Sequence, residues 1–346
     1  MILNQTQDQL ELRSAVSKFI DGVTPLSAVR TAMESELGYD AAVWRRLCGE
    51  LAVPALAVSE EGGGAGFGMP ELAAAMQEFG AGLVPGPLFG SGVLVAQVLD
   101  AIGDKVLLPE VVAGTKIAAL VQDSSLRADN GTVTGEAFGV LDAMAADVFV
   151  VVAGLSVYAV DATADGVTRT ALETLDPTRR QGAVSFTDAV ASELGPAERV
   201  AHGIDRATVA LAAEQVGVME RSVRLAVEYA KVREQFGRKI GSFQAVKQGL
   251  ADIYASYELA ASAVAYAAWV ADNEPDQLAV AASVAKAYVG PQAFQAVSQM
   301  IQYHGGIGYT WEHDAHLFYK RAKTNETLLG TADEHLERIA AALLDD

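Results

Sequence analysis

The stretch KVREQFGRKIGSFQAVK, residues 231–247, constrains the fold of this chain more than any other. It holds one acid, Glu234, and five basic residues, although the 346-residue chain carries a formal net charge of −19. The basic residues are Lys231, Arg233, Arg238, Lys239 and Lys247. Guanidinium groups suit bidentate contacts to phosphate, so the cluster indicates an anionic ligand. A solvated helix end that complements the helix dipole is the alternative on composition alone.

Hydrophobic periodicity divides the chain into a helical, a β and a second helical part. Apolar residues recur at helical spacing in residues 5–23. Short β-like runs follow at 116–122, 131–137 and 182–188, and 147–161 has the pattern of a hairpin that turns near Ala153 and Gly154. From Glu198 the helical period returns, with later helices expected over 276–303 and 333–344. We therefore predict an α+β, mainly α protein with an N-terminal helical domain (1–111), a middle β-domain (112–197) and a C-terminal four-helix bundle (198–346).

Composition excludes several classes of protein. The acidic balance argues against nucleic-acid binding, because phosphates repel such a surface. No apolar run is long enough to span a membrane, and the N-terminus lacks the pattern of a signal peptide. Cys48 is the single cysteine, which fits a reducing cytoplasm. The glycine-rich segment 60–71 does not match GxGxxG in register, so we interpret it as a connector rather than a dinucleotide loop.

A second motif, QYHGGIGYTWEHDAHLFYKRAK (residues 302–323), makes the assignment specific. Together with residues 229–247 it closely resembles the C-terminal domain of acyl-CoA dehydrogenases, and the α/β/α order agrees over the whole chain. The resemblance implies FAD bound across a subunit interface. It assigns Arg233 to the pyrophosphate, and it places Gln235, Phe236, Gln244 and Thr331 at cofactor-binding positions. It also places Gln302, Gly305 and Gly306 at the adenine end of a neighbouring subunit's FAD.

The same resemblance implies a reaction. In the family a glutamate removes the α-proton of an acyl-CoA thioester, the β-hydride passes to the flavin, and an electron-transfer flavoprotein receives the electrons. Here Leu329 stands where that glutamate belongs, and leucine cannot accept a proton. Some members place the base on an earlier helix, at the position of Ala207 and Thr208 here. Both positions therefore lack a carboxylate, so no catalytic residue is assigned.

With these departures, the chain resembles the non-catalytic subunit of bacterial α2β2 acyl-CoA dehydrogenases. Those enzymes act on steroid side chains and similar bulky acyl-CoAs. The segment that helps hold flavin and the tryptophan that covers it are also missing from the middle domain. We expect the chain to complete the FAD site of a catalytic partner. Two alternatives stay open: a homomeric enzyme with a relocated base such as Glu326, and an inactive scaffold that binds CoA thioesters.

Other polar residues have weaker claims. Glu214, Glu220 and Glu312 are further carboxylates whose default interpretation is a surface role. His304, Glu312, His313 and His316 suggest a metal cluster, but His313 and His316 are three residues apart, whereas a helical zinc pair usually uses four. We therefore expect no metal.

Overall fold

The computed structural model describes residues 5–344 and divides into two compact units. The helical unit comprises the chain up to Leu26, Ala73–Val84, and the chain from Thr208. The sheet unit comprises Ser27–Leu72 and Pro85–Ala207. None of the helices within the described range is long and apolar enough to cross a bilayer.

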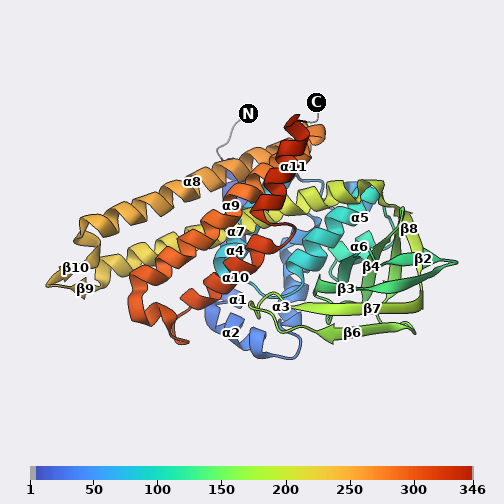
Figure 1. Cartoon of the computed structure of the whole chain (residues 1–346). Coiled ribbons are helices and arrows are strands. Elements are labelled where there is room, and N and C mark those ends of the chain that lie inside the picture. Colours follow the sequence, from blue (N-terminus) through green and yellow to red (C-terminus); the bar gives the residue numbers. More distant parts are fainter. Residues whose placement is uncertain (1–4, 345–346) are drawn as a thin grey trace. The chain divides into compact units, whose positions relative to one another are not determined.

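Figure 1 labels the helices and strands along the chain. The α-helices are α1 (Gln7–Val23), α2 (Leu26–Glu34), α3 (Ala41–Arg46), α4 (Met69–Gly82), α5 (Ala96–Ile102), α6 (Leu108–Val112), α7 (Val200–Val232), α8 (Gln244–Asn273), α9 (Leu278–His304), α10 (Ala315–Thr327) and α11 (Ala332–Leu344). The strands are β1 (Ala118–Gln122), β2 (Arg127–Asp129), β3 (Thr132–Leu141), β4 (Val148–Ala153), β5 (Ser156–Asp161), β6 (Val167–Ala171), β7 (Gln181–Val190), β8 (Ser192–Pro196), β9 (Glu234–Gln235) and β10 (Arg238–Lys239).

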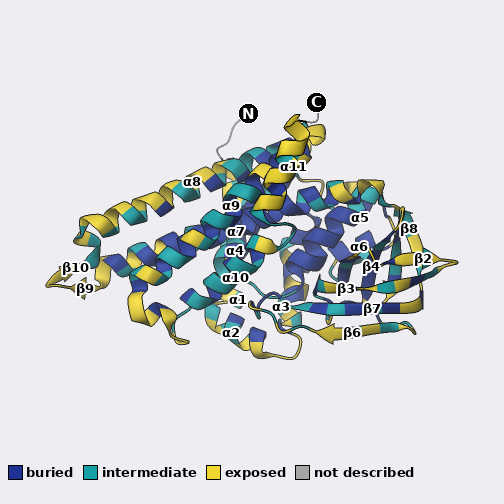
Figure 2. Cartoon of the chain, viewed as in Figure 1, coloured by how far each residue is buried: buried dark blue, intermediate teal, exposed yellow. Residues whose placement is uncertain are grey.

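The helical unit is organised around α9, which packs against α8, α10 and α11. Alanine-rich stripes allow this close packing, and much of α9 is buried (Figure 2). The predicted helices at 276–303 and 333–344 are α9 and α11, and α10 is an additional helix between them. Glycines bring α4 and α7 together, because a side chain on Gly80 or Gly217 would overlap the backbone of the facing helix.

The sheet unit contains two four-stranded sheets, with strand orders β1-β4-β5-β8 and β2-β3-β7-β6. β1 pairs with β4 in parallel, and all other neighbours are antiparallel. The predicted hairpin is β4–β5, whereas the short polar strands β2, β6 and β8 are additional. Phe149 of β4 and Phe186 of β7 meet edge to face at 5.7 Å in the core shared by the two sheets.

The first sheet is covered on both faces, which explains why β4 is almost continuously apolar. Phe149 and Val151 face the core shared with the second sheet, whereas Val148 and Val150 pack in a cluster with apolar residues of α5 and α6. Strands buried on both faces need not alternate between polar and apolar residues. The fold thus has the helical and β elements that the sequence predicts.

Candidate cofactor site

The basic stretch 231–247 runs from the end of α7 to the start of α8, and its middle part, β9–β10, forms a β-hairpin (Figure 1). Arg238 pairs with Gln235 and Lys239 with Glu234 in the antiparallel ladder. The two turn residues are Phe236 (φ 54°) and Gly237 (φ 75°). Positive φ at both central residues is the conformation that matches a two-residue hairpin to the twist of its strands. This short ladder is a structural feature that the sequence pattern did not predict.

Phe236 is held in an uncommon backbone conformation, and its ring meets the ring of Phe243 edge to face at a centroid distance of 6.2 Å. Its side chain is 92% exposed at the tip of the hairpin. A left-handed conformation at a residue other than glycine costs of order 1–3 kcal/mol and often marks a binding site. A Cβ on Gly237 would meet nothing within 4 Å, so the space beside the tip is open. An exposed aromatic ring presented in this way is suited to covering part of a ligand.

The charges of the hairpin are unevenly neutralised. Lys239 lies 2.7 Å from Glu234 and lowers the pKa of that carboxyl by a hydrogen bond. The Arg238 guanidinium lies 4.0 Å above the ring of Phe243. Within residues 5–344 the Arg233 side chain has no ion pair or hydrogen bond of its own. The Arg233 guanidinium is therefore available for a bidentate contact to a diphosphate.

The glycines of the second motif leave the end of α9 open. Gln302 is exposed in the last turn of α9, and Gly305 ends the helix with a φ of 61°. A Cβ on Gly305 or on Gly306 would meet nothing within 4 Å. The backbone there is accessible to a flat ligand, which fits a nucleotide.

A ring stack joins the two motifs. His304 precedes Gly305, and its imidazole stacks on Tyr229, four residues before Arg233, with ring centroids 4.4 Å apart. The Nδ1 atom of His304 donates to the Met300 carbonyl oxygen at 2.8 Å, which fixes the ring. The basic hairpin and the glycine turn therefore lie at the same end of the helical unit, although about seventy residues separate them in the sequence.

The other predicted cofactor residues are less distinctive. Gln244 is the exposed first residue of α8, and the Gln235 amide donates to the backbone oxygen of Glu234. Thr331 caps α11: its N–H donates to the Glu334 carboxylate at 2.7 Å and its hydroxyl accepts from the Glu334 N–H at 3.4 Å. This reciprocal capping box gives Thr331 a structural role that the sequence analysis did not consider.

Residues 325–331, to which the family resemblance assigns the base, are called the base segment. Hydrogen bonds hold this segment in place. Leu329 adopts a left-handed conformation (φ 58°), and His335 donates from Nε2 to the Leu329 carbonyl oxygen at 3.0 Å. The Nδ1 atom of His335 accepts from the Ser283 hydroxyl at 3.2 Å. The backbone at the base position is thus fixed although its side chain is aliphatic.

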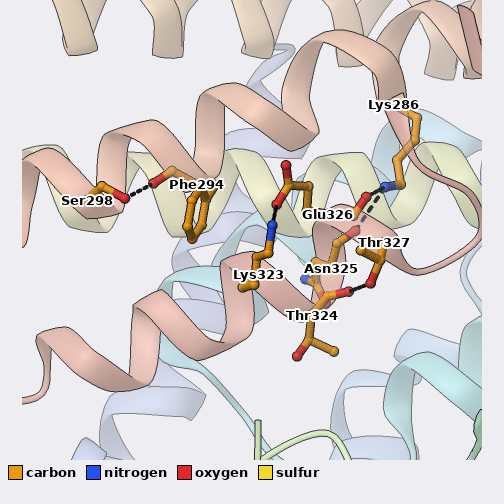
Figure 3. Close-up of polar contacts among 8 residues, drawn as sticks. All are labelled: Lys286, Phe294, Ser298, Lys323, Thr324, Asn325, Glu326 and Thr327. Carbon is orange, nitrogen blue, oxygen red and sulfur yellow. Dashed lines mark hydrogen bonds and ion pairs between the residues drawn. The ribbon is translucent and has the colours of Figure 1, made fainter. Parts of the chain in front are cut away.

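Lys286 anchors the other end of the base segment (Figure 3). The amine is 1% exposed and donates to the carbonyl oxygens of Asn325 and Glu326, each at 2.9 Å. Burial lowers its pKa to about 8, although Glu326 and Glu334 act in the opposite direction. The sequence analysis did not single out Lys286 or His335. Two sequence features could have indicated them: Lys286 is a cation within the apolar stripe of α9, and His335 is a histidine that follows Gly330 closely.

The alternative carboxylates are occupied by cations. Glu326 lies 2.7 Å from the ammonium of Lys323, as Figure 3 shows. The other two ion pairs join Glu214 to buried Arg321 at 2.6 Å and Glu220 to Arg13 at 2.7 Å. Glu312 is exposed. Glu326, Glu214 and Glu220 are therefore engaged in ion pairs within the helical unit.

The histidines of the second motif pack against aromatic rings. His304 and His313 lie 4.5 Å apart, and His316 lies 4.6 Å from the ring of Trp311. In the part of the chain that the structure describes, no three His, Cys, Asp or Glu side chains are grouped to hold a metal ion.

Comparisons with known proteins agree with this architecture. Models of the N-terminal and C-terminal domains of acyl-CoA dehydrogenases match residues 6–113 and 198–344. Acyl-CoA dehydrogenase IpdE2 of Mycobacterium tuberculosis is 36% identical over 340 residues, which cover 96% of each chain. A chain in the crystal structure of the ChsE4–ChsE5 complex from M. tuberculosis superimposes with a TM-score of 0.90 at 29% identity, covering 100% of both chains. The structure of the Tcur3481–Tcur3483 steroid ACAD G363A variant gives 0.89 at 28% identity, covering 98% of both chains. This chain belongs to the acyl-CoA dehydrogenase family.

Proposed function

We propose that this chain is the non-catalytic subunit of a heteromeric, FAD-dependent acyl-CoA dehydrogenase. It would supply nucleotide-binding elements to a site whose base lies on a partner subunit. The observation that carries the proposal is the contrast between two parts of the helical unit. The hairpin retains an unpaired Arg233 and an exposed Phe236, whereas the base position holds Leu329.

The residues present fit the nucleotide part of FAD. Arg233 would bind the pyrophosphate, and Phe236 would cover part of the cofactor. The exposed Gln302 and the open backbone at Gly305 and Gly306 would meet the adenine end of a second FAD. Gln235, Gln244 and Thr331 would contribute from the rim, Thr331 through the one hydroxyl lone pair that its cap leaves available. When bound, the flavin supplies the acceptor for the β-hydride of the substrate.

The chain's own residues provide no evident proton acceptor at the base position. Leu329 has no lone pair, and the nearest carboxylate along the chain, that of Glu326, is paired with Lys323. A positioned general base typically contributes about 10²–10⁴-fold to a rate. An enzyme that relied on this chain alone would therefore lack that contribution, which favours a partner that carries the carboxylate.

The likeness to one chain of the ChsE4–ChsE5 complex, which contains two different proteins, supports a heteromer, for which we propose an α2β2 arrangement. The substrate we propose is a bulky acyl-CoA, and the steroid ACAD among the relatives favours a steroid-derived chain. An electron-transfer flavoprotein would then reoxidise the reduced flavin. We place the complex in the cytoplasm.

The test is to express the chain alone, a candidate catalytic partner from its genomic neighbourhood alone, and the two together. Flavin absorbance per protein and acyl-CoA-dependent reduction of a dye would be measured for each. We expect flavin and activity only in the co-purified complex. A flavinated and active homomer of this chain would refute the proposal.

Two variants separate the alternatives within the same experiment. Glu326→Gln in the complex should leave dye reduction unchanged, whereas a relocated base at Glu326 would lose at least a hundredfold. Lys323→Gln breaks the same ion pair from the other side and serves as the matched control. A complex that forms with CoA thioesters but never reduces the dye would instead indicate a scaffold.

A further inference from the structure

The glycine-rich connector at 60–68 is a folded wall of a pocket in the sheet unit. Its backbone is fixed to the preceding turn, because Ala65 N donates to Ala55 O at 2.8 Å and Gly66 N donates to Val58 O at 3.2 Å. A Cβ on Gly64 would overlap the Val58 carbonyl, so glycine is required there. The connector thus presents Gly66 and Phe67 to a pocket of about 540 Å³.

The opposite wall of this pocket is basic. Arg199, His202 and Arg206 line it at helical spacing, from the last residue before α7 to its second turn. The first turn of α7 contains no acidic residue, although Glu198 lies in the 3-10 turn directly before it. Arg206 is oriented by Gln97, whose amide oxygen accepts from Nε at 2.5 Å, and by the Ala57 carbonyl oxygen, which accepts from Nη2 at 3.1 Å.

One carboxylate, that of Asp100, also lines the pocket. It accepts from the Ser59 hydroxyl at 2.6 Å and from the Ser59 N–H at 3.3 Å, so its charge is partly satisfied by the turn. Burial lowers the pKa of His202, and the neighbouring Arg206 and Arg199 lower it further. Asp205 acts on His202 in the opposite direction but less strongly than either arginine. A positive pocket is notable in a chain whose net charge is −19.

The remaining lining is suited to a planar or apolar group. Phe67 is 61% exposed at the pocket, and Ala57, Val58 and Ile102 add aliphatic surface. Small-molecule sites typically have volumes of about 300–1,000 Å³ and combine apolar walls with a few polar groups. This pocket has that size and that division of its walls.

We propose that this pocket binds a small organic phosphate whose phosphate group lies among Arg199, His202 and Arg206 and whose planar group lies against Phe67. A nucleoside monophosphate is the simplest ligand with both parts. Two arginines beside a helix N-terminus match the charge of a phosphate, and the aromatic ring matches the face of a base. The site uses none of the residues assigned to the flavin or to the base segment.

The test is isothermal titration calorimetry of the full chain, or of its complex with a partner, using AMP as the probe. Adenosine and inorganic phosphate each carry one half of the ligand, and succinate replaces phosphate by carboxylate. We expect AMP to bind more tightly than all three. If inorganic phosphate bound as tightly as AMP, the planar group would contribute nothing to binding. If succinate bound as tightly as AMP, the pocket would have no preference for phosphate. Either result overturns the proposal.

Variants locate the site. Arg199→Gln and His202→Gln change polar lining residues, and Phe67→Ala removes the ring, so each should weaken AMP by about tenfold or more. Arg45→Gln removes an equal charge elsewhere in the sheet unit and should change nothing. Arg233→Gln tests whether AMP binds at the flavin hairpin instead. AMP binding lost in Arg233→Gln but retained in Arg199→Gln would contradict the proposal, as would the absence of any AMP binding to the folded wild-type chain.

Discussion

His304 and Tyr229 stack ring on ring, with their planes inclined by 26°, and thereby join the end of α9 to the end of α7. This contact sets the positions of Gly305 and Arg233 although neither stacked ring needs to touch the cofactor. We predict that Tyr229→Leu lowers the flavin content of the heteromeric complex, whereas Tyr229→Phe, which keeps the ring, does not. Absorbance at the flavin maximum per mole of complex measures both. Equal flavin content in the two variants would show that the stack between His304 and Tyr229 does not affect flavin binding.

Arg233 is expected to contribute strongly to cofactor affinity. A hydrogen bond to a charged group contributes about 1.5–3 kcal/mol, so Arg233→Gln should weaken FAD by roughly 10–100-fold. Arg233→Lys should recover only part of this loss, because an ammonium lacks the planar fork. Titration of the flavin-stripped complex with FAD gives the affinities. Arg45→Gln is the control for the change in net charge, and a similar loss in that variant would argue against a local contact.

Substitution of Phe236 should change the stability of the chain and its affinity for FAD in opposite directions. Phe236→Asn suits the left-handed conformation better and is expected to stabilise the chain by up to about 1 kcal/mol. The same change removes the ring and should weaken FAD. Denaturant unfolding of the chain and flavin titration of the complex measure the two effects. Gly237→Ala is the opposite control, since its φ of 75° disfavours a side chain and the variant should lose stability. A Phe236→Asn variant that lost stability would show that the edge-to-face contact with Phe243 outweighs the cost of the left-handed backbone.

The buried ion pair between Glu214 and Arg321 should be costly to break from one side. Both side chains are 1% exposed, and the Asn325 amide also donates to Glu214 at 3.2 Å. Arg321→Met should lower the unfolding free energy by about 3–5 kcal/mol, whereas the double change with Glu214→Leu should lose less. The exposed pair Arg46–Glu50 is the matched control, because Arg46→Met should cost less than about 1 kcal/mol. Similar losses from the two single variants would contradict this interpretation.

Because Lys286 is buried, we predict that the free energy of unfolding depends on pH in the alkaline range. Its pKa is lowered from 10.5 to about 8 in the folded chain, so between these values the unfolded chain binds the proton more tightly. Stability contributed by this group therefore rises as pH increases from about 8 to 10.5, by on the order of 3 kcal/mol. The measurement is the difference in unfolding free energy between wild type and Lys286→Met across this range. A difference that stays flat would mean that the amine titrates normally.

Helical and β regions could be predicted from periodicity because long amphipathic runs leave a strong pattern. The hairpin at β9–β10 could not, since each strand has two residues and all of them are exposed. Thr331 illustrates a different limit. Its spacing to Glu334 is a capping-box signal that can be read from the sequence, but the resemblance alone suggested a cofactor contact.

The side chains that hold the base segment in place could not be predicted from the sequence either. Lys286 contacts carbonyl oxygens about forty residues away, and His335 contacts both Ser283 and the Leu329 carbonyl. Periodicity predicts which face of a helix is buried, but it does not identify the partner of a polar residue on that face. The placing of Leu329 at the position of the family's glutamate stays a prediction, which rests on counting residues along the motif.

The basic hairpin also affects how copies of the chain behave in dilute buffer. Its cations lie on an exposed hairpin between the end of α7 and the start of α8 (Figure 2), and the chain has a formal net charge of −19. At low ionic strength we expect the hairpin of one copy to attract acidic residues of another copy. Salt at about 0.15 M screens such attractions beyond about 8 Å. Light scattering from the purified chain should accordingly fall when sodium chloride or a polyphosphate is added.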